Sequence, residues 1–186
     1  MEKLKIGVVG LGRLGRVHAQ NIRYKIPGAV LTAACSIVPA ELEYAKNELG
    51  VTDVYTDYKE MLAKADIDAV VIVTTSSEHC WQIEAALDAG KHVFSEKPLG
   101  VDVAQCKQAE AAVERHPELT FMLGFMRRYD KSYSYAKQKI EEGAIGTPYL
   151  VKATGIDPEA FVEGAIRFAK NSGGIFLDMA IHDIDL

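Results

Sequence analysis

The sequence predicts an α/β fold in which a doubly wound parallel sheet is followed by an incomplete second α/β domain. The first observation is a regular alternation of short β-rich segments with segments of helix length, which is typical of a parallel sheet with right-handed crossovers. The second is segment 69–73, whose unbroken apolar run indicates a strand covered on both faces. The third is that this regular alternation of strand-like and helix-length segments ends after residue 124. We therefore expect one domain at 1–123 and another at 124–186.

The first domain contains the alternating elements. Pro39 suits the first position of a helix, where its missing N–H costs nothing. Gly90 is expected to end one helix and Pro117 to stop another. Strands are expected at 4–9, 30–35, 69–73, 92–95 and 120–123, and helices at 13–24, from 39 onward, at 79–89 and at 103–114.

The second domain has a different pattern. Helices are expected near 132–142 and 158–169 and again after Gly173-Gly174, with a strand at 149–154. A single strand is not a stable layer, and no later segment of the sequence resembles a strand. We therefore expect the chain to end inside this domain.

Composition and charge exclude several classes of protein. Apolar residues make up 48% and charged residues 25%, and the net charge is −5, so neither a nucleic-acid footprint nor attraction to an anionic membrane is expected. The N-terminus lacks the features of a signal peptide. The three cysteines, an odd number with no C-x-x-C pair, disfavour a disulfide framework or a zinc site. We expect a cytoplasmic protein with reduced cysteines.

A glycine-rich loop follows the first expected strand and opens the first helix. Its residues are Gly10, Leu11, Gly12, Arg13, Leu14 and Gly15. The first glycine permits a tight turn, the second lets a pyrophosphate approach the backbone, and the third allows close packing of helix on sheet. Phosphates then face exposed N–H groups at the positive end of the helix dipole. Because the motif lies between a strand and a helix, it predicts a dinucleotide-binding Rossmann domain.

Ser36 stands at the end of the second strand, where an acidic residue usually holds the ribose 2′-hydroxyl. This position offers no carboxylate to repel a 2′-phosphate and no neighbouring arginine to attract one. NAD is slightly preferred as the cofactor over NADP, because binding a phosphate normally calls for a cation.

Four further segments form a set of motifs: SEKPL at 95–99, VTTSSEH at 73–79, GFMRRY at 124–129 and GGIFLDMAIHD at 173–183. Together they resemble those of the glucose–fructose oxidoreductase and inositol dehydrogenase family, with Thr75 in place of the family's usual proline. The resemblance covers nearly the whole chain, and the inositol dehydrogenases are the branch it favours. It implies a Rossmann domain followed by an α/β domain with a large open sheet, in a chain longer than this one.

Lys97, Asp178 and His182 are the expected catalytic residues. Lys97 follows a parallel strand at the edge where open α/β sheets bind ligands, and it can orient a substrate oxygen. Asp178 and His182, four apart on a helix, suit a base and the carboxylate that orients it. The alternatives are a surface lysine paired with Glu96 and a structural aspartate–histidine pair. No metal is expected, because hydride transfer needs none; the alternative is a metal ion bound by Asp178, His182, Asp183 and Asp185.

Further residues are expected to contact the cofactor. Besides the glycine loop, Ser36 and Lys97, they are Thr74, Thr75, Ser76, His79, Glu96 and Arg127. For His79 the alternative is a buried histidine whose hydrogen bonds are satisfied, and for Arg127 it is a solvated arginine. His18, His92, His116 and Trp81 are expected to be structural.

These expectations combine into an oxidoreductase that transfers a hydride between a nicotinamide cofactor and a secondary alcohol of a cyclic polyol or sugar. The alternative is a sensor or regulator of the same architecture that binds dinucleotide without catalysis. The full-length protein is expected to form homo-oligomers, and this 186-residue chain alone is expected to be inactive.

Overall fold

The computed structural model describes residues 2–156, 158–169 and 172–186. The chain divides into two compact units, Met1–Leu123 and Gly124–Leu186, and each is described by itself. Within the described residues, no helix combines the length and apolarity needed to cross a membrane.

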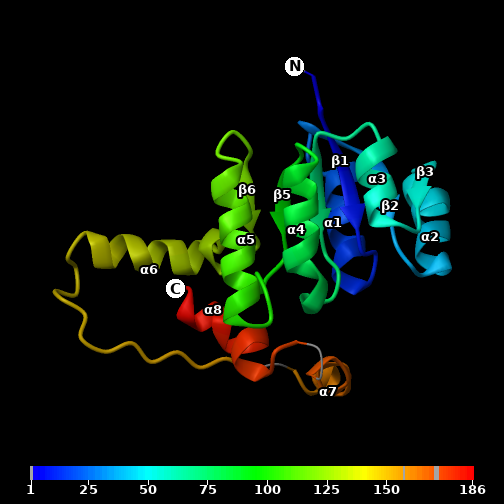
Figure 1. Cartoon of the computed structure of the whole chain (residues 1–186). Coiled ribbons are helices and arrows are strands. Elements are labelled where there is room, and N and C mark those ends of the chain that lie inside the picture. The colour runs from blue at the N-terminus through cyan, green and yellow to red at the C-terminus, as the bar shows by residue number, and fades with distance from the viewer. Residues whose placement is uncertain (1, 157, 170–171) are drawn as a thin grey trace. The chain divides into compact units, whose positions relative to one another are not determined.

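The first unit is built on a six-stranded sheet whose strands all run parallel (Figure 1). The strands are β1 (Leu4–Val9), β2 (Ala29–Cys35), β3 (Asp53–Tyr55), β4 (Ala69–Ile72), β5 (His92–Ser95) and β6 (Phe121–Leu123). Their order, β3-β2-β1-β4-β5-β6, is that of a Rossmann fold with its switch point between β1 and β4. The predicted doubly wound parallel sheet is confirmed.

The connecting helices cover both faces of this sheet. They are α1 (Arg13–Tyr24), α2 (Pro39–Leu49), α3 (Tyr58–Lys64), α4 (His79–Asp88) and α5 (Val103–Arg115). Successive strand residues point to opposite faces, so Val8 packs with residues of α1 and α2, whereas Val9 packs with residues of α3, α4 and α5. Each face has its own apolar core.

Two elements of this unit, β3 and α3, escaped the sequence analysis. The three residues of β3 are only half-buried, so they lack the apolar run of a central strand. The N-terminus of α3 is capped by Asp57, whose side chain accepts a hydrogen bond from the backbone N–H of Glu60 at 2.7 Å. This capping aspartate was the available sequence signal.

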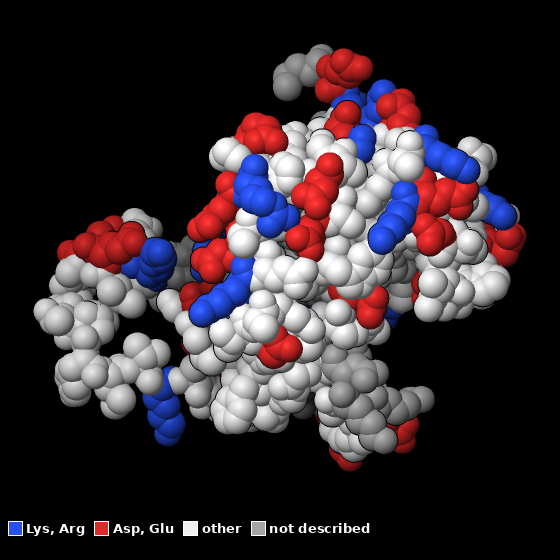
Figure 2. Space-filling model, in the orientation of Figure 1, with Lys and Arg blue, Asp and Glu red and all other residues white. Residues whose placement is uncertain are grey.

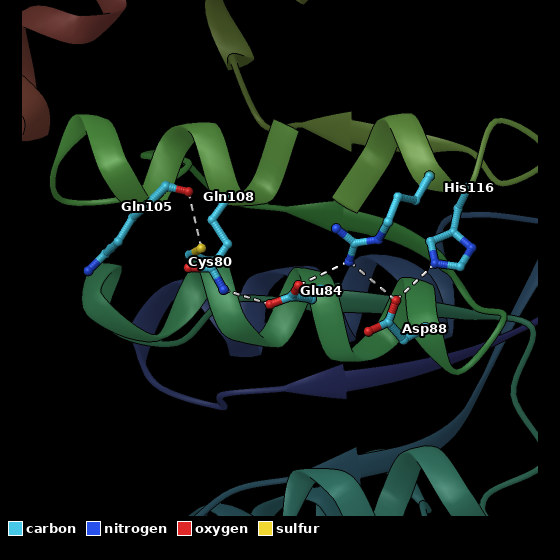
Figure 3. A network of polar contacts seen from close by, with 7 residues as sticks. Cys80, Glu84, Asp88, Gln105, Gln108 and His116 are labelled. Carbon is cyan, nitrogen blue, oxygen red and sulfur yellow. Dashed lines mark hydrogen bonds and ion pairs between the residues drawn. The ribbon is translucent and has the colours of Figure 1, made fainter. Parts of the chain in front are cut away.

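A polar network joins α4 to α5, which pack side by side on one face of the sheet (Figure 3). Glu84 on α4 accepts hydrogen bonds from Gln108 at 2.7 Å and from Arg115 at 3.0 Å. Asp88 lies 2.9 Å from Nε2 of His116. These contacts fix the ends of the two helices relative to each other.

The second unit is helical in its described residues. Its elements are the 3₁₀ turns at Met126–Tyr129 and Glu159–Phe161, α6 (Lys131–Glu141), α7 (Val162–Ala169), the π-helical segment η4 (Phe176–Ala180) and α8 (Ile181–Ile184). The expected strand at 149–154 is wrong, because these residues are exposed and form no strand. A strand requires a hydrogen-bonded neighbour, and the described part of this unit contains no other strand.

Charged side chains of both signs are interspersed on the face seen in Figure 2. Elsewhere on the surface too, charged residues form short-range pairs along a helix, such as Lys64 with Glu60 at 2.7 Å. Such pairs contribute little to stability.

Replacing Ile83 with alanine is expected to lower the free energy of unfolding by about 2–5 kcal/mol, because it leaves a cavity in a packed core. Ile83, on α4, is fully buried in one of the two apolar cores. The matched control is Ile26→Ala, at a residue that is 47% exposed, which is expected to change the same quantity by about 0.5 kcal/mol or less. Urea titration followed by circular dichroism measures both, and equal losses would contradict this packing.

The contact between His116 and Asp88 is expected to make stability depend on pH. Its hydrogen bond raises the pKa of His116 and lowers the pKa of Asp88. The stability contributed by His116 is present below its unfolded pKa and is lost as pH rises through its raised folded pKa. The stability contributed by Asp88 is lost as pH falls through its depressed folded pKa. His116→Asn should therefore lower the melting temperature near about pH 5.5 and leave it unchanged near about pH 9, as measured by thermal unfolding. An equal effect at both pH values would count against a charged pair.

Candidate functional site

The carboxyl ends of four strands are aligned at one edge of the sheet. Val9, the last residue of β1, is in register with Cys35 at the end of β2 and with Ile72 at the end of β4. Ile72 is in turn in register with Ser95 at the end of β5. The loops that follow these strands therefore emerge together, at the edge where open α/β sheets bind ligands.

The glycine loop after β1 packs too closely for side chains at two of its positions. Gly10 has φ +85°, and a Cβ atom added to it would lie 2.5 Å from the carbonyl oxygen of Val73. A Cβ at Gly15 would lie 2.0 Å from the carbonyl oxygen of Gly10. The loop therefore holds β1, the start of α1 and the loop after β4 in close contact.

Gly12 differs, because the space beside it is open. It precedes α1 with φ −66°, and the nearest atom to a Cβ added there is Oε1 of Glu41, at 3.9 Å. The first N–H groups of a helix have no partner within it, and they carry the positive end of the helix dipole. An open approach to such amides fits the pyrophosphate of a dinucleotide, as the sequence motif predicts.

A carboxylate lies beside this loop, contrary to the sequence analysis. Ser36 is buried and donates a hydrogen bond of 2.6 Å to Oε2 of Glu41, in the first turn of α2. The same oxygen accepts a hydrogen bond from the backbone N–H of Leu11 at 3.1 Å. The usual position of the acidic residue, at the strand end, points only to Ser36, so Glu41, five residues further on, is missing from the predicted site. Its place in the helical turn opened by Pro39 was the signal that could have found it.

The loop after β4 is fixed largely by buried contacts. Thr74 donates a hydrogen bond to the Gln82 side chain at 2.6 Å, and Ser76 is buried, whereas Thr75 is exposed. A contact of any of these threonines or of Ser76 with the cofactor stays a prediction.

His79 ties the loops after β4 and β5 together. Its ring is 1% exposed, with Nδ1 2.7 Å from the carbonyl oxygen of Pro98 and Nε2 3.2 Å from that of Thr74. Burial lowers the pKa of His79, so the neutral ring carries one N–H, which can be donated to only one of these oxygens at a time. His79 is therefore a buried histidine with a structural contact to each loop, which corresponds to the alternative given for it from the sequence.

The loop after β5 contains the expected lysine. Lys97 is half-buried, and its peptide bond to Pro98 is cis. The preceding residue, Glu96, lies with Oε1 2.7 Å from Nε2 of His18 on α1. His18, expected to be structural, thus links α1 to the loop that carries Lys97.

Asp178 and His182 lie in the second unit, in η4 and α8 respectively. The helix expected to carry both is therefore a π-helical segment followed by a short α-helix. Both residues are half-buried, and the His182 ring lies edge-on to Phe125, with the ring centroids 6.4 Å apart. A joint catalytic role with Lys97, which belongs to the first unit, stays a prediction.

Two arginines are bound to the carboxyl-terminal helix of the second unit. Arg127 forms an ion pair with Asp183, and Arg128 binds Asp185 through Nε at 2.8 Å and a terminal nitrogen at 2.5 Å. The carboxylates of Asp183 and Asp185 are thus both in ion pairs with arginines. No group of side chains suited to a metal ion is found among the described residues.

Comparison with known proteins identifies relatives for both units. Residues 4–125 match the family described as "Oxidoreductase family, NAD-binding Rossmann fold", and residues 133–186 match the "GFO/IDH/MocA C-terminal domain". The scyllo-inositol 2-dehydrogenase (NAD(+)) of Bacillus subtilis is 39% identical over 184 residues, and the myo-inositol 2-dehydrogenase of Thermotoga maritima is 36% identical over 183. These alignments cover 99% and 98% of the chain, respectively, and 53% of each relative.

A solved structure is also similar. The scyllo-inositol dehydrogenase of Lactobacillus casei, with bound NAD(H) and scyllo-inositol, is 54% identical, with a TM-score of 0.94 over 99% of this chain and 55% of that one. The chain thus spans about half the length of the relatives that it matches. The glycine loop, the strand order and both family matches agree, and the chain belongs to the GFO/IDH/MocA family of oxidoreductases with an NAD-binding Rossmann fold.

Proposed function

We propose that the protein containing this chain is a nicotinamide-dependent dehydrogenase that oxidises a secondary alcohol of a cyclic polyol, with an inositol as the first candidate. One observation carries the proposal: the open, amide-lined start of α1 and the loop bearing Lys97 follow strands whose ends are aligned at one edge of the sheet. The similar proteins are named inositol dehydrogenases, which supports the substrate class. Two of these names include NAD, which supports the coenzyme.

The side chains of this chain account for the proton that leaves the alcohol. When bound, the nicotinamide ring accepts the hydride from the alcohol carbon. Lys97 donates a hydrogen bond to the substrate oxygen and orients that carbon. His182 accepts the hydroxyl proton as a general base, and Asp178 orients the imidazole and stabilises its protonated form. The product is a ketone.

NAD is the proposed coenzyme in preference to NADP. A cyclic polyol or sugar is the proposed partner molecule, and homo-oligomerisation and a cytoplasmic location stay predictions from the sequence. The other cofactor contacts proposed from the sequence are those of the loops after β4 and β5 and of Arg127.

The decisive experiment combines calorimetric titration with NAD and NADP and a screen of inositols and related polyols on the intact protein. Coenzyme binding together with ketone formation from a cyclic polyol would support the proposal. Coenzyme binding without turnover of any polyol would favour the alternative, a dinucleotide-binding regulator.

Replacing Gly12 with alanine is expected to weaken coenzyme binding without unfolding the protein. The added methyl group meets open space at Gly12, which is the space that the pyrophosphate is proposed to fill. The dissociation constant for NAD should rise by about tenfold or more, since hydrogen bonds to a charged group are lost. Gly28→Ala, where an added Cβ meets nothing within 4 Å, is the matched control. Calorimetry measures both, and equal affinities would place the pyrophosphate elsewhere.

Replacing His182 with asparagine is expected to lower kcat by about 10²–10⁴-fold, the usual contribution of a general base. Affinity for NAD should change little, because the proposed role of His182 is proton transfer from the alcohol. His116→Asn, assayed near about pH 9, where the His116 side chain is expected to be uncharged, is the control histidine. Steady-state kinetics and calorimetry give both quantities; an unchanged kcat would remove His182 from the mechanism.

A further inference from the structure

The carboxylate of Glu41 lies between the two segments that border a dinucleotide site. Oε2 accepts hydrogen bonds from the backbone N–H of Leu11, in the glycine loop, and from the hydroxyl of Ser36, at the end of β2. Leu11 and Glu41 are 30 residues apart in sequence. The contact therefore depends on β1 and β2 pairing side by side.

The surrounding residues hold this carboxylate in place. Ser36 is 6% exposed, and its hydroxyl oxygen also accepts a hydrogen bond from the backbone N–H of Val38 at 3.0 Å. That contact directs the Ser36 proton toward Glu41. Glu41 lies in the first turn of α2, where the helix dipole favours a negative charge. The side chain is thus oriented before any ligand arrives.

The second oxygen of Glu41 faces the open side of the glycine loop. Among the described residues, and leaving aside Gly12's chain neighbours and the backbone of α1, Oε1 is the nearest atom to a Cβ added at Gly12, at 3.9 Å. In Rossmann domains an acidic residue at the end of the second strand accepts a hydrogen bond from the ribose 2′-hydroxyl. Here Ser36 occupies that strand end, and the carboxylate reaches the same border of the loop from α2.

We propose that Glu41 selects NAD over NADP: its carboxylate accepts a hydrogen bond from the adenine ribose and repels a phosphate at the 2′ position. The inference rests on the proposed coenzyme-dependent function and deepens it, because it assigns coenzyme choice to a residue outside the glycine motif. A carboxylate beside the adenine ribose disfavours a phosphate at the 2′ position, because like charges repel each other.

A nearby cation, Arg16, is expected to increase the shift toward NADP when the charge of Glu41 is removed. Arg16 donates a hydrogen bond from Nε to the carbonyl oxygen of Leu11 at 3.1 Å, and its guanidinium lies 4.3 Å from the centre of the Tyr44 ring. Without the carboxylate, the field of Arg16 favours a 2′-phosphate.

The test is calorimetric titration of the intact protein with NAD and with NADP, for the wild type and Glu41→Gln. The wild type is expected to bind NAD more tightly. In Glu41→Gln the ratio of the two dissociation constants should move toward NADP by about 10- to 100-fold, the range for a hydrogen bond to a charged group. Glu43→Gln, on the exposed side of α2 next to Lys46, is the matched control and should leave the ratio unchanged.

A second variant tests the same arrangement while keeping the negative charge. Ser36→Ala removes the donor that orients Glu41, so affinity for NAD should fall by about threefold to tenfold. Thermal unfolding checks that each variant is folded. A wild-type ratio in folded Glu41→Gln, or unchanged NAD affinity in folded Ser36→Ala, would overturn the inference.

The outcomes separate this inference from the proposed activity. If the wild type binds neither coenzyme, both fail. If it binds NAD but oxidises no polyol, the proposed activity fails, and the shift of the ratio in Glu41→Gln still supports or overturns the role of Glu41.

Discussion

The structure of the first unit depends on the parallel register of β1 with β2 and β4, and of β4 with β5. This register aligns Val9, Cys35, Ile72 and Ser95 at one edge of the sheet. The loops after β1, β2, β4 and β5 begin directly after these residues. A shift of one residue would turn apolar side chains away from the two cores, so the packing that stabilises the sheet also fixes where the loops emerge.

Close backbone contacts then set the shape of the site. Gly10 and Gly15 allow the first loop to approach Val73 and to fold tightly on itself, while His79 links the carbonyl groups of two neighbouring loops. Glu96 is held by His18 from α1. The residue proposed to act on substrate, Lys97, thus belongs to a loop that is anchored on both sides of its position. Anchoring of this kind supplies the orientation on which hydride transfer depends.

Some errors of the sequence analysis share one cause, the use of local pattern alone. Alternation at 149–154 resembled a strand, but a strand exists only with a neighbour. The short β3 was overlooked because three half-buried residues give no clear apolar run. Ser36 suggested a site without a carboxylate, yet Glu41 lies against its hydroxyl.

The sequence by itself determined the parallel α/β fold and the position of the glycine loop, because apolar runs, helix-length spacing and turn glycines are local signals. It also carried the family motifs around Lys97, Asp178 and His182. Only the tertiary structure decided which distant side chains meet. Leu11 with Glu41, Glu96 with His18 and Pro98 with His79 are separated by 30, 78 and 19 residues. Strand register and helix packing bring these pairs together, and no local sequence pattern around any of these residues predicts its partner.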